Sequence, residues 1–287
     1  MRSFKLNKIR FNIHLIFFTV ALLISGCSSG QKTNTEVPSK EQTIKRYLEN
    51  GAWRVRYFSP EYQLYIDSAI NENPNIAYLY QQKAMPYFKQ SKYEQGLKYL
   101  EVAVKIDPKT HIDYAAFIKC IFVKNYNNAI VDFQTAKLIK GANGFVMDHS
   151  YDFYLGLCYL QLNQFEKALP YFENSINQMK KSNGENWVHY LDLHYLGITL
   201  QELNRHREAV EAFDKALISY PNFSDAKYYK AISLFRLNQS NSAEQLLTES
   251  ESDFKKGFTI NEDNSAYEKY PYQLKQFYID MLRITKK

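Results

Sequence analysis

The same apolar pattern occurs twice in this chain. YLGLCYLQLNQFEKALPYF runs from Tyr154 to Phe172, and YLGITLQELNRHREAVEAF runs from Tyr195 to Phe213. Tyr, Leu, Gly, Leu-Asn, Ala and Phe recur at matching offsets, whereas the residues between them differ. Self-similarity at a fixed period of about 20–50 residues is the signature of a repeat architecture. The pattern therefore predicts packing units that stack on one another, and not a catalytic motif.

The pattern extends over most of the chain. One small residue recurs at Gly96, Ala129, Ala168, Ala209 and Ala243, and the two middle steps are longer than the first and the last. A large residue follows four positions later, at Leu100, Phe133, Phe172, Phe213 and Leu247. Twelve positions before the small residue stand Ala84, Phe117, Gly156, Gly197 and Ala231. From about residue 43 onward the apolar residues have helical spacing without an alternating strand pattern, which predicts an all-α fold.

This register resembles the tetratricopeptide repeat, a helix–turn–helix unit of about 34 residues. In the unit from Tyr190 to Phe223, the family's characteristic positions hold Gly197, Ala209, Phe213, Ala216 and Pro221. Gly or Ala lets the two helices cross closely, and Pro ends the second helix because it cannot donate a backbone hydrogen bond. The resemblance implies a right-handed superhelical solenoid of about six repeats over residues 43–250, followed at 251–287 by a C-terminal extension with a capping helix.

Two of the steps, from Ala129 to Ala168 and from Ala168 to Ala209, are too long for a regular repeat. The extra residues lie around GANGFVMDHS and KKSNGENWVH. They predict longer turns or longer helices between repeats, and insertions in solenoids tend to form loops that carry binding.

The N-terminus has the order of a secretory signal. Arg2, Lys5, Lys8 and Arg10 precede the apolar run LIFFTVALLI, which is well short of the ~20 residues that span a bilayer. The following ISGC resembles the bacterial lipobox, which implies that Cys27 is lipidated and becomes the first residue of the mature chain. The alternative is an uncleaved membrane anchor in which this cysteine is incidental.

We therefore expect a lipoprotein signal peptide at residues 1–26, and a lipidated cysteine with a flexible tether at 27–42. The two or three acyl chains of a lipoprotein hold a protein stably on a membrane. Ser28 follows the cysteine, and the sorting rule of enteric lipoproteins then implies the outer membrane. The expected location is the bacterial cell envelope, with the folded part lipid-anchored and facing the periplasm.

The charge balance argues against nucleic acid as a partner, and the cysteine content bears on disulfides. The formal net charge is +6, but without the four basic residues of the signal the chain has 32 basic and 30 acidic residues. This balance does not provide the concentrated basic face that nucleic acid requires. Beyond Cys27, the sequence has only Cys120 and Cys158, both in apolar helical surroundings. We expect two buried thiols, with a disulfide as the alternative.

Catalytic and metal-binding patterns are not evident. The sequence has no GxSxG motif, phosphate loop or dinucleotide fingerprint. His189 and His194 are five positions apart, whereas two ligands on one helical face are three or four apart. We expect no enzyme activity, no cofactor and no metal; a hydrolase that uses His189, Asp192 and His194 is the catalytic alternative.

A binding face follows from the resemblance to tetratricopeptide repeats. In that family, positions two, five, nine and twelve of each first helix line a groove. The candidate peptide-binding residues are Tyr78, Gln81, Phe88, His111, Tyr114, Phe153, His194, Gln201 and Tyr228. Aromatic, amide and imidazole groups suit an extended peptide. The alternative is packing between neighbouring first helices, which we favour for Ile118, Leu157, Ile198 and Ile232 and leave open for Tyr78, Tyr114, Tyr228 and His194.

These features predict a non-enzymatic, membrane-anchored scaffold that binds a protein or peptide partner in the cell envelope. The alternative is a structural lipoprotein that binds envelope glycan, or an outer-membrane assembly complex, through its loops. Trp187 in the second insertion is the candidate residue for stacking on a sugar.

Overall fold

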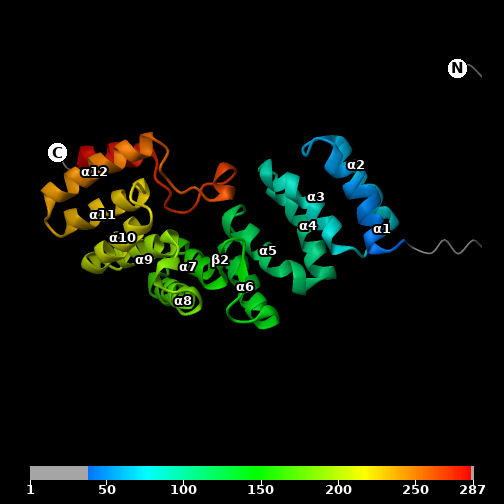
Figure 1. Cartoon of the computed structure of the whole chain (residues 1–287), viewed down its shortest axis with the longest axis horizontal. Coiled ribbons are helices and arrows are strands. Elements are labelled where there is room, and N and C mark those ends of the chain that lie inside the picture. The colour runs from blue at the N-terminus through cyan, green and yellow to red at the C-terminus, as the bar shows by residue number, and fades with distance from the viewer. Residues whose placement is uncertain (1–37, 286–287) are drawn as a thin grey trace, which may run out of the picture. The chain divides into compact units, whose positions relative to one another are not determined.

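The computed structural model describes residues 38–285, and this part of the chain is mainly helical (Figure 1). It starts with α1 (Lys40–Ile44), which continues into the π-helical turn η1 (Lys45–Glu49), the short helix η2 (Ala52–Arg54) and α2 (Pro60–Glu72). Ser39 and Gln42 form a capping box that starts α1 at Lys40, and residues 27–37 of the expected tether lie outside the described residues. None of the helices described is long and apolar enough to cross a membrane.

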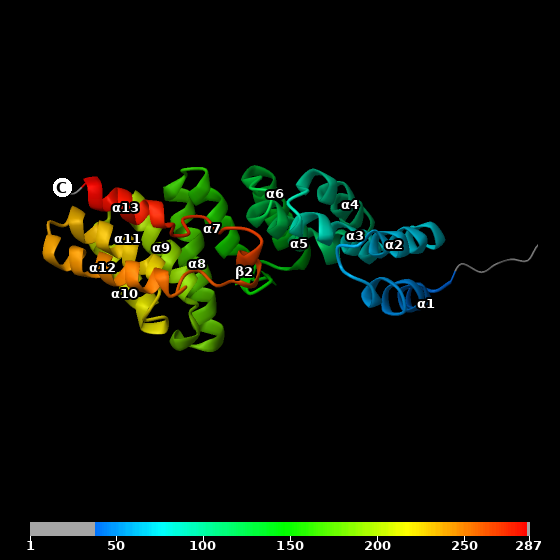
Figure 2. The same ribbon diagram turned by 90° about the horizontal axis from the view of Figure 1, so that it is seen from above.

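Five helical hairpins follow in residues 77–255. They are α3 (Ala77–Lys89) with α4 (Tyr93–Ile106), α5 (Pro108–Ile121) with α6 (Tyr126–Lys140), α7 (Tyr151–Gln161) with α8 (Phe165–Asn183), α9 (Tyr190–Glu202) with α10 (His206–Ser219), and α11 (Ser224–Arg236) with α12 (Ser240–Lys255). The two helices of each hairpin pack on each other, and each second helix packs on the next first helix (Figures 1 and 2). This arrangement confirms the predicted all-α solenoid of helix–turn–helix repeats.

Glycines lie where the two helices of a hairpin come closest. A Cβ atom added at Gly197 would lie 2.6 Å from the ring of Phe213, and one at Gly156 would lie 2.8 Å from Phe172. Gly96 has the same relation to Phe88, at 2.7 Å. An aromatic ring therefore occupies the space of the missing side chain, which explains why the two residue types recur together.

The Leu-Asn pair of the repeated pattern forms the turn between the helices. Asn163, Asn204 and Asn238 have φ angles of 55°, 59° and 61°, a left-handed conformation that Asn adopts more readily than most residues. The amide after each Asn donates back into the helix, as from Arg205 to the Leu200 carbonyl at 2.8 Å. This is the helix-ending bond of a Schellman motif.

The two insertions have different structures. The first forms an antiparallel hairpin of β1 (Phe145–Val146) and β2 (His149–Ser150) before α7. The second extends α8 to 19 residues and adds the short helix η3 (Glu185–Trp187) before α9. The prediction of longer turns and longer helices is confirmed.

The C-terminal region after α12 consists of a long connecting stretch and a last helix. After α12, residues 256–275 run back along the first helices to the level of α5, with a short helix η4 (Asp263–Ala266) near the far end (Figures 1 and 2). We call residues 256–275 the return segment. The chain then forms α13 (Gln276–Thr285), which packs near α12 and buries Ile279 completely.

Candidate functional site

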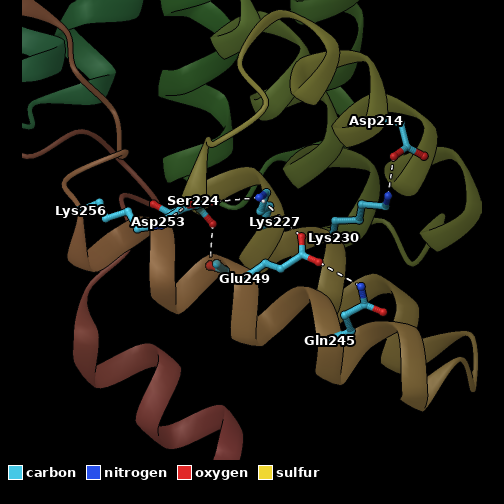
Figure 3. Close-up of polar contacts among 9 residues, drawn as sticks. Asp214, Ser224, Lys227, Lys230, Gln245, Glu249, Asp253 and Lys256 are labelled. Carbon is cyan, nitrogen blue, oxygen red and sulfur yellow. Dashed lines mark hydrogen bonds and ion pairs between the residues drawn. The ribbon is translucent and has the colours of Figure 1, made fainter.

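The first helices α3, α5, α7, α9 and α11 form the face where the resemblance places a ligand, and we call it the first-helix face. Its far end is fixed by polar contacts between α11 and α12 (Figure 3). Lys227 donates to Asp253 at 2.7 Å and lies 3.6 Å from Glu249, and the Ser250 hydroxyl donates to the Ser224 carbonyl at 2.8 Å. The Ser224 amide donates in turn to the Phe258 carbonyl at 2.9 Å, where the return segment begins.

Asp225 fastens both ends of the return segment to α11. One oxygen of its buried carboxylate accepts the Leu274 amide at 2.7 Å, and the other accepts the Thr259 hydroxyl at 2.7 Å. Hydrogen bonds to a carboxylate are about twice as strong as neutral ones. The Asp225 side chain therefore holds two distant points of the return segment, Thr259 and Leu274, on α11.

The first-helix face also binds the main chain of the return segment and its neighbour α13. The hydroxyl groups of Tyr195, Tyr229 and Tyr228 donate to the carbonyl oxygens of Pro271, Tyr272 and Tyr278, at 2.8, 2.9 and 3.1 Å. At the other end, Lys124 donates to the Lys269 carbonyl at 2.8 Å. Ile260, Tyr270 and Leu274 of the segment are buried. The face thus binds its own C-terminal region through main-chain carbonyl oxygens, at a turn where Tyr272 has a φ of 56° and at the start of α13.

Most of the predicted groove residues of α7, α9 and α11 are covered or take part in the core, whereas Gln201 is half-buried. His194 and Phe153 are fully buried, and Tyr228 is 7% exposed. His194 packs among the rings of Phe213, Phe223 and Tyr229, and burial lowers its pKa to about 3. Gln201 accepts the Ser233 hydroxyl at 3.3 Å. His194 and Phe153 therefore do not line an open groove.

The predicted groove residues of α3 and α5 lie differently. Tyr78, Gln81 and Tyr114 are half-buried, and the Gln81 amide oxygen lies 2.7 Å from Nδ1 of the buried His111. A cavity of 560 Å³ lies between α1, α3 and α5, and Tyr78 and His111 are among the residues that line it. Phe88 is buried against Gly96 and is a core residue, which corrects its assignment to the groove. The open part of the predicted groove is therefore its N-terminal end.

Sequence reasoning missed a cluster at the two insertions. His149, His189 and Asp192 each offer one ligand atom within 4.8 Å of the others, and Glu262 of the return segment lies 3.4 Å from His149. Burial alone would lower the pKa of His149, but its contacts with Asp192 and Glu262 outweigh burial and raise it to about 9. His194 packs elsewhere, so the hydrolase constellation that the sequence suggested is not assembled. The cluster was concealed because a whole helical hairpin, α7 with α8, separates its two histidines in the sequence.

The two cysteines of the core lie side by side. The Sγ atoms of Cys120 and Cys158 are 3.5 Å apart, and both residues are free thiols and fully buried. Burial is the main cause that raises the pKa of the Cys158 thiol, and the contact with Cys120 raises it further. This arrangement agrees with the predicted pair of buried thiols. The lipidation candidate Cys27 lies outside the described residues.

The insertions present exposed apolar side chains. Trp187 is 68% exposed, and Phe145 and Met147 of the first insertion are 47% and 44% exposed. Trp187 thus has the accessibility that the glycan alternative requires.

Comparison with known proteins agrees with this geometry. Family models of the tetratricopeptide repeat match residues 77–110, 149–221 and 196–253. They define a solenoid protein built for interaction with other proteins. Over these residues the chain consists of tetratricopeptide repeats, and proteins built of this repeat are typically non-catalytic scaffolds. A search of curated proteins gave no match.

Solved structures share the fold at low sequence identity. PilW, a type IV pilus biogenesis factor, is 13% identical with a TM-score of 0.59, covering 75% of this chain and 93% of PilW. PilF of Pseudomonas aeruginosa is 12% identical with a TM-score of 0.55, and the match covers 76% of this chain and 98% of PilF. The C-terminal part of a repeat protein of Cytophaga hutchinsonii is 15% identical with a TM-score of 0.54, and the match covers 76% of this chain and 80% of that one. These likenesses concern the fold alone.

Proposed function

We propose that this chain is a lipid-anchored scaffold of the bacterial cell envelope that holds a protein partner on its first-helix face. The repeat fold supports an interaction role. The order of basic residues, short apolar run and ISGC supports the anchor at Cys27. The outer membrane, with the solenoid in the periplasm, is the proposed location.

The binding of the return segment is the observation that carries the proposal. Tyr195, Tyr229 and Lys124 donate to its main-chain carbonyl oxygens. Such bonds do not depend on the side chains of the bound segment, so the same face can recognise an extended backbone of other sequence. The chain's own C-terminal region shows which chemistry the face offers.

The partner site is the part of this face that the return segment leaves open. It consists of the half-buried Tyr78 and Gln81 on α3 and Tyr114 on α5, beside the cavity at α1, with the buried His111 beneath Gln81. Phenol rings and an amide within one region provide flat surfaces for apolar side chains and partners for a peptide backbone.

A matched pair of variants tests this site. Full-length chain with Tyr78→Ser should lose its partner, whereas Tyr80→Ser, two positions further along the same helix, should keep it. The measurement is capture of envelope proteins on the immobilised chain in detergent, compared by mass spectrometry for wild type and both variants. Equal capture by Tyr78→Ser and wild type would contradict the proposed site.

The anchor has its own test. Cys27→Ser removes the thiol that the lipid would modify, so the variant should lose the acyl mass on Cys27 and leave the detergent-rich phase on partitioning. A control change, Ser29→Ala, should alter neither result. Membrane attachment of Cys27→Ser equal to that of wild type would contradict lipid anchoring and favour an uncleaved apolar anchor.

A second candidate function is binding of envelope glycan through the insertions. The observation that favours it is the exposed indole of Trp187, since flat aromatic rings stack on sugars. Binding to isolated envelope polysaccharide should then be lost in Trp187→Ala and retained in Tyr78→Ser. The opposite result would assign the interaction to the first-helix face.

A further inference from the structure

Four polar side chains from separate parts of the chain meet where both insertions contact the return segment. His149 belongs to β2 of the first insertion, and His189 precedes α9 at the end of the second. Asp192 lies in the first turn of α9, and Glu262 precedes η4 in the return segment. The two histidines therefore come from the two stretches that break the regular repeat.

The distances in this cluster suit a metal ion. One ligand atom from each of His149, His189 and Asp192 lies within 4.8 Å of the others, and His149 Nδ1 is 3.5 Å from Asp192 Oδ2. Ligand atoms around tetrahedral zinc, with bonds of about 2.0–2.1 Å, lie roughly 3.3 Å apart. The three groups could close on one ion with small side-chain movements.

The hydrogen bonding of the cluster is incomplete in a way that an ion would complete. His149 is 1% exposed and Asp192 is fully buried, yet both imidazole nitrogens of His149 and Oδ2 of Asp192 have no hydrogen-bond partner. Leaving a buried polar group without a partner costs about 1–3 kcal/mol. An ion between His149 Nδ1 and Asp192 Oδ2 would satisfy both atoms.

The surroundings hold these groups in place. The His149 ring stacks on Phe153 with centroids 3.8 Å apart, and Asp192 Oδ1 accepts the Ser175 hydroxyl at 2.5 Å. Glu262 lies 3.4 Å from Nε2 of His149 and 4.0 Å from Nε2 of His189, and Nδ1 of His189 accepts the Leu191 amide at 3.4 Å. Histidines that bind a metal usually donate their other ring N–H to a carboxylate. With an ion at Nδ1 of His149, a small movement would let the Nε2–H of that ring donate to Glu262.

We propose that His149, His189 and Asp192 bind a divalent transition-metal ion of the zinc class, and that Glu262 orients the imidazole of His149. Two imidazoles and one carboxylate are the ligands of known three-ligand zinc sites, which leave a fourth position for water. His189 is 32% exposed on its side chain and provides the entry path. Because Glu262 belongs to the return segment, the ion would strengthen the attachment of this segment to the insertions.

Metal binding to the full-length chain tests this proposal. Chain purified in detergent and stripped with a chelator is equilibrated with Zn²⁺, and bound zinc is measured after gel filtration; Co²⁺ absorption reports the ligand geometry. Wild type should bind one ion per chain. His189→Gln and Asp192→Asn should lose it, and Glu262→Gln should weaken it about 10–100-fold, the usual effect of losing an orienting group.

His206→Gln is the matched control, because it removes a histidine outside the cluster and should leave zinc binding unchanged. His149 is deeply buried, so the half-exposed His189 provides the decisive variant, with circular dichroism to confirm the fold. Absence of bound zinc in wild type, or equal binding by wild type and His189→Gln, would overturn the proposal. The cluster would then be a buried imidazolium between two carboxylates. Neither result bears on partner binding at Tyr78.

Discussion

At the scale of single residues, burial separates groove residues from core residues. The repeat register placed His194 correctly on a first helix, but the register alone does not show what covers that helix. The structure places the ring among aromatic side chains, with both nitrogens unpartnered. By contrast, Tyr78 stays half-buried because the return segment does not extend over it.

The buried His194 should make the fold sensitive to acid. Its pKa is about 3 in the folded chain, because burial disfavours the charged form, and 6.5 is the ordinary value. The neutral form thus contributes stability that is present above pH 6.5 and is lost as pH falls toward 3. At pH 5 the loss is about 2 kcal/mol, from about 1.4 kcal/mol per pH unit. Unfolding by denaturant at pH 7.5 and 5.0 should show a smaller acid loss in His194→Leu, and an equal loss would contradict this role.

Gly197 should tolerate no side chain. An added Cβ would lie 2.6 Å from the Phe213 ring, so Gly197→Ala should destabilise the chain by about 1–3 kcal/mol, the usual cost of overpacking a core. Thermal unfolding measures the change. The double variant with Phe213→Leu is the control, because a smaller side chain should recover part of the loss. Strict additivity of the two changes would show that the ring and the glycine do not compete for space.

At the scale of elements, the helical hairpins could be predicted and the return segment could not. Small residues, Leu-Asn turns and following aromatics are local patterns, and each fixes a hairpin within a single repeat. The return segment has no such period, since its path depends on distant contacts such as Lys124 with Lys269 and Asp225 with Leu274. On the last helix, Ile279 is fully buried, whereas Phe277 and Met281 are 63% and 41% exposed.

Asp225 should control the attachment of the return segment. Asp225→Ala leaves the buried Leu274 amide and the Thr259 hydroxyl without their acceptor, at about 1–3 kcal/mol for each group. A loss of about 1.4 kcal/mol raises the opened population about tenfold. Limited proteolysis should therefore cut residues 256–275 at least about ten times faster. Asp280→Ala, an exposed change on α13, is the control and should leave the rate of cleavage unchanged. An unchanged rate in Asp225→Ala would show that Asp225 does not hold the return segment on α11.

At the scale of the whole molecule, lipidation and redox state can be read from one thiol count. The lipidated chain should contain two thiols, at Cys120 and Cys158, and the unmodified chain three. Both buried thiols should react with a thiol reagent only after unfolding, because burial hinders access and raises the pKa of Cys158. A count of none in the unfolded, unreduced chain would show that the two have formed a disulfide.

The central feature of the molecule is the chain's own C-terminal region, which occupies the first-helix face from α5 to α11. Hydrogen exchange at the Leu274 amide tests it directly, since this amide donates to the buried Asp225 carboxylate. Exchange of this amide should be far slower than in an unfolded peptide, and it should be much faster in Asp225→Ala. Exchange of Leu274 at the unfolded rate in the wild-type chain would contradict this arrangement and leave the whole face open to a partner.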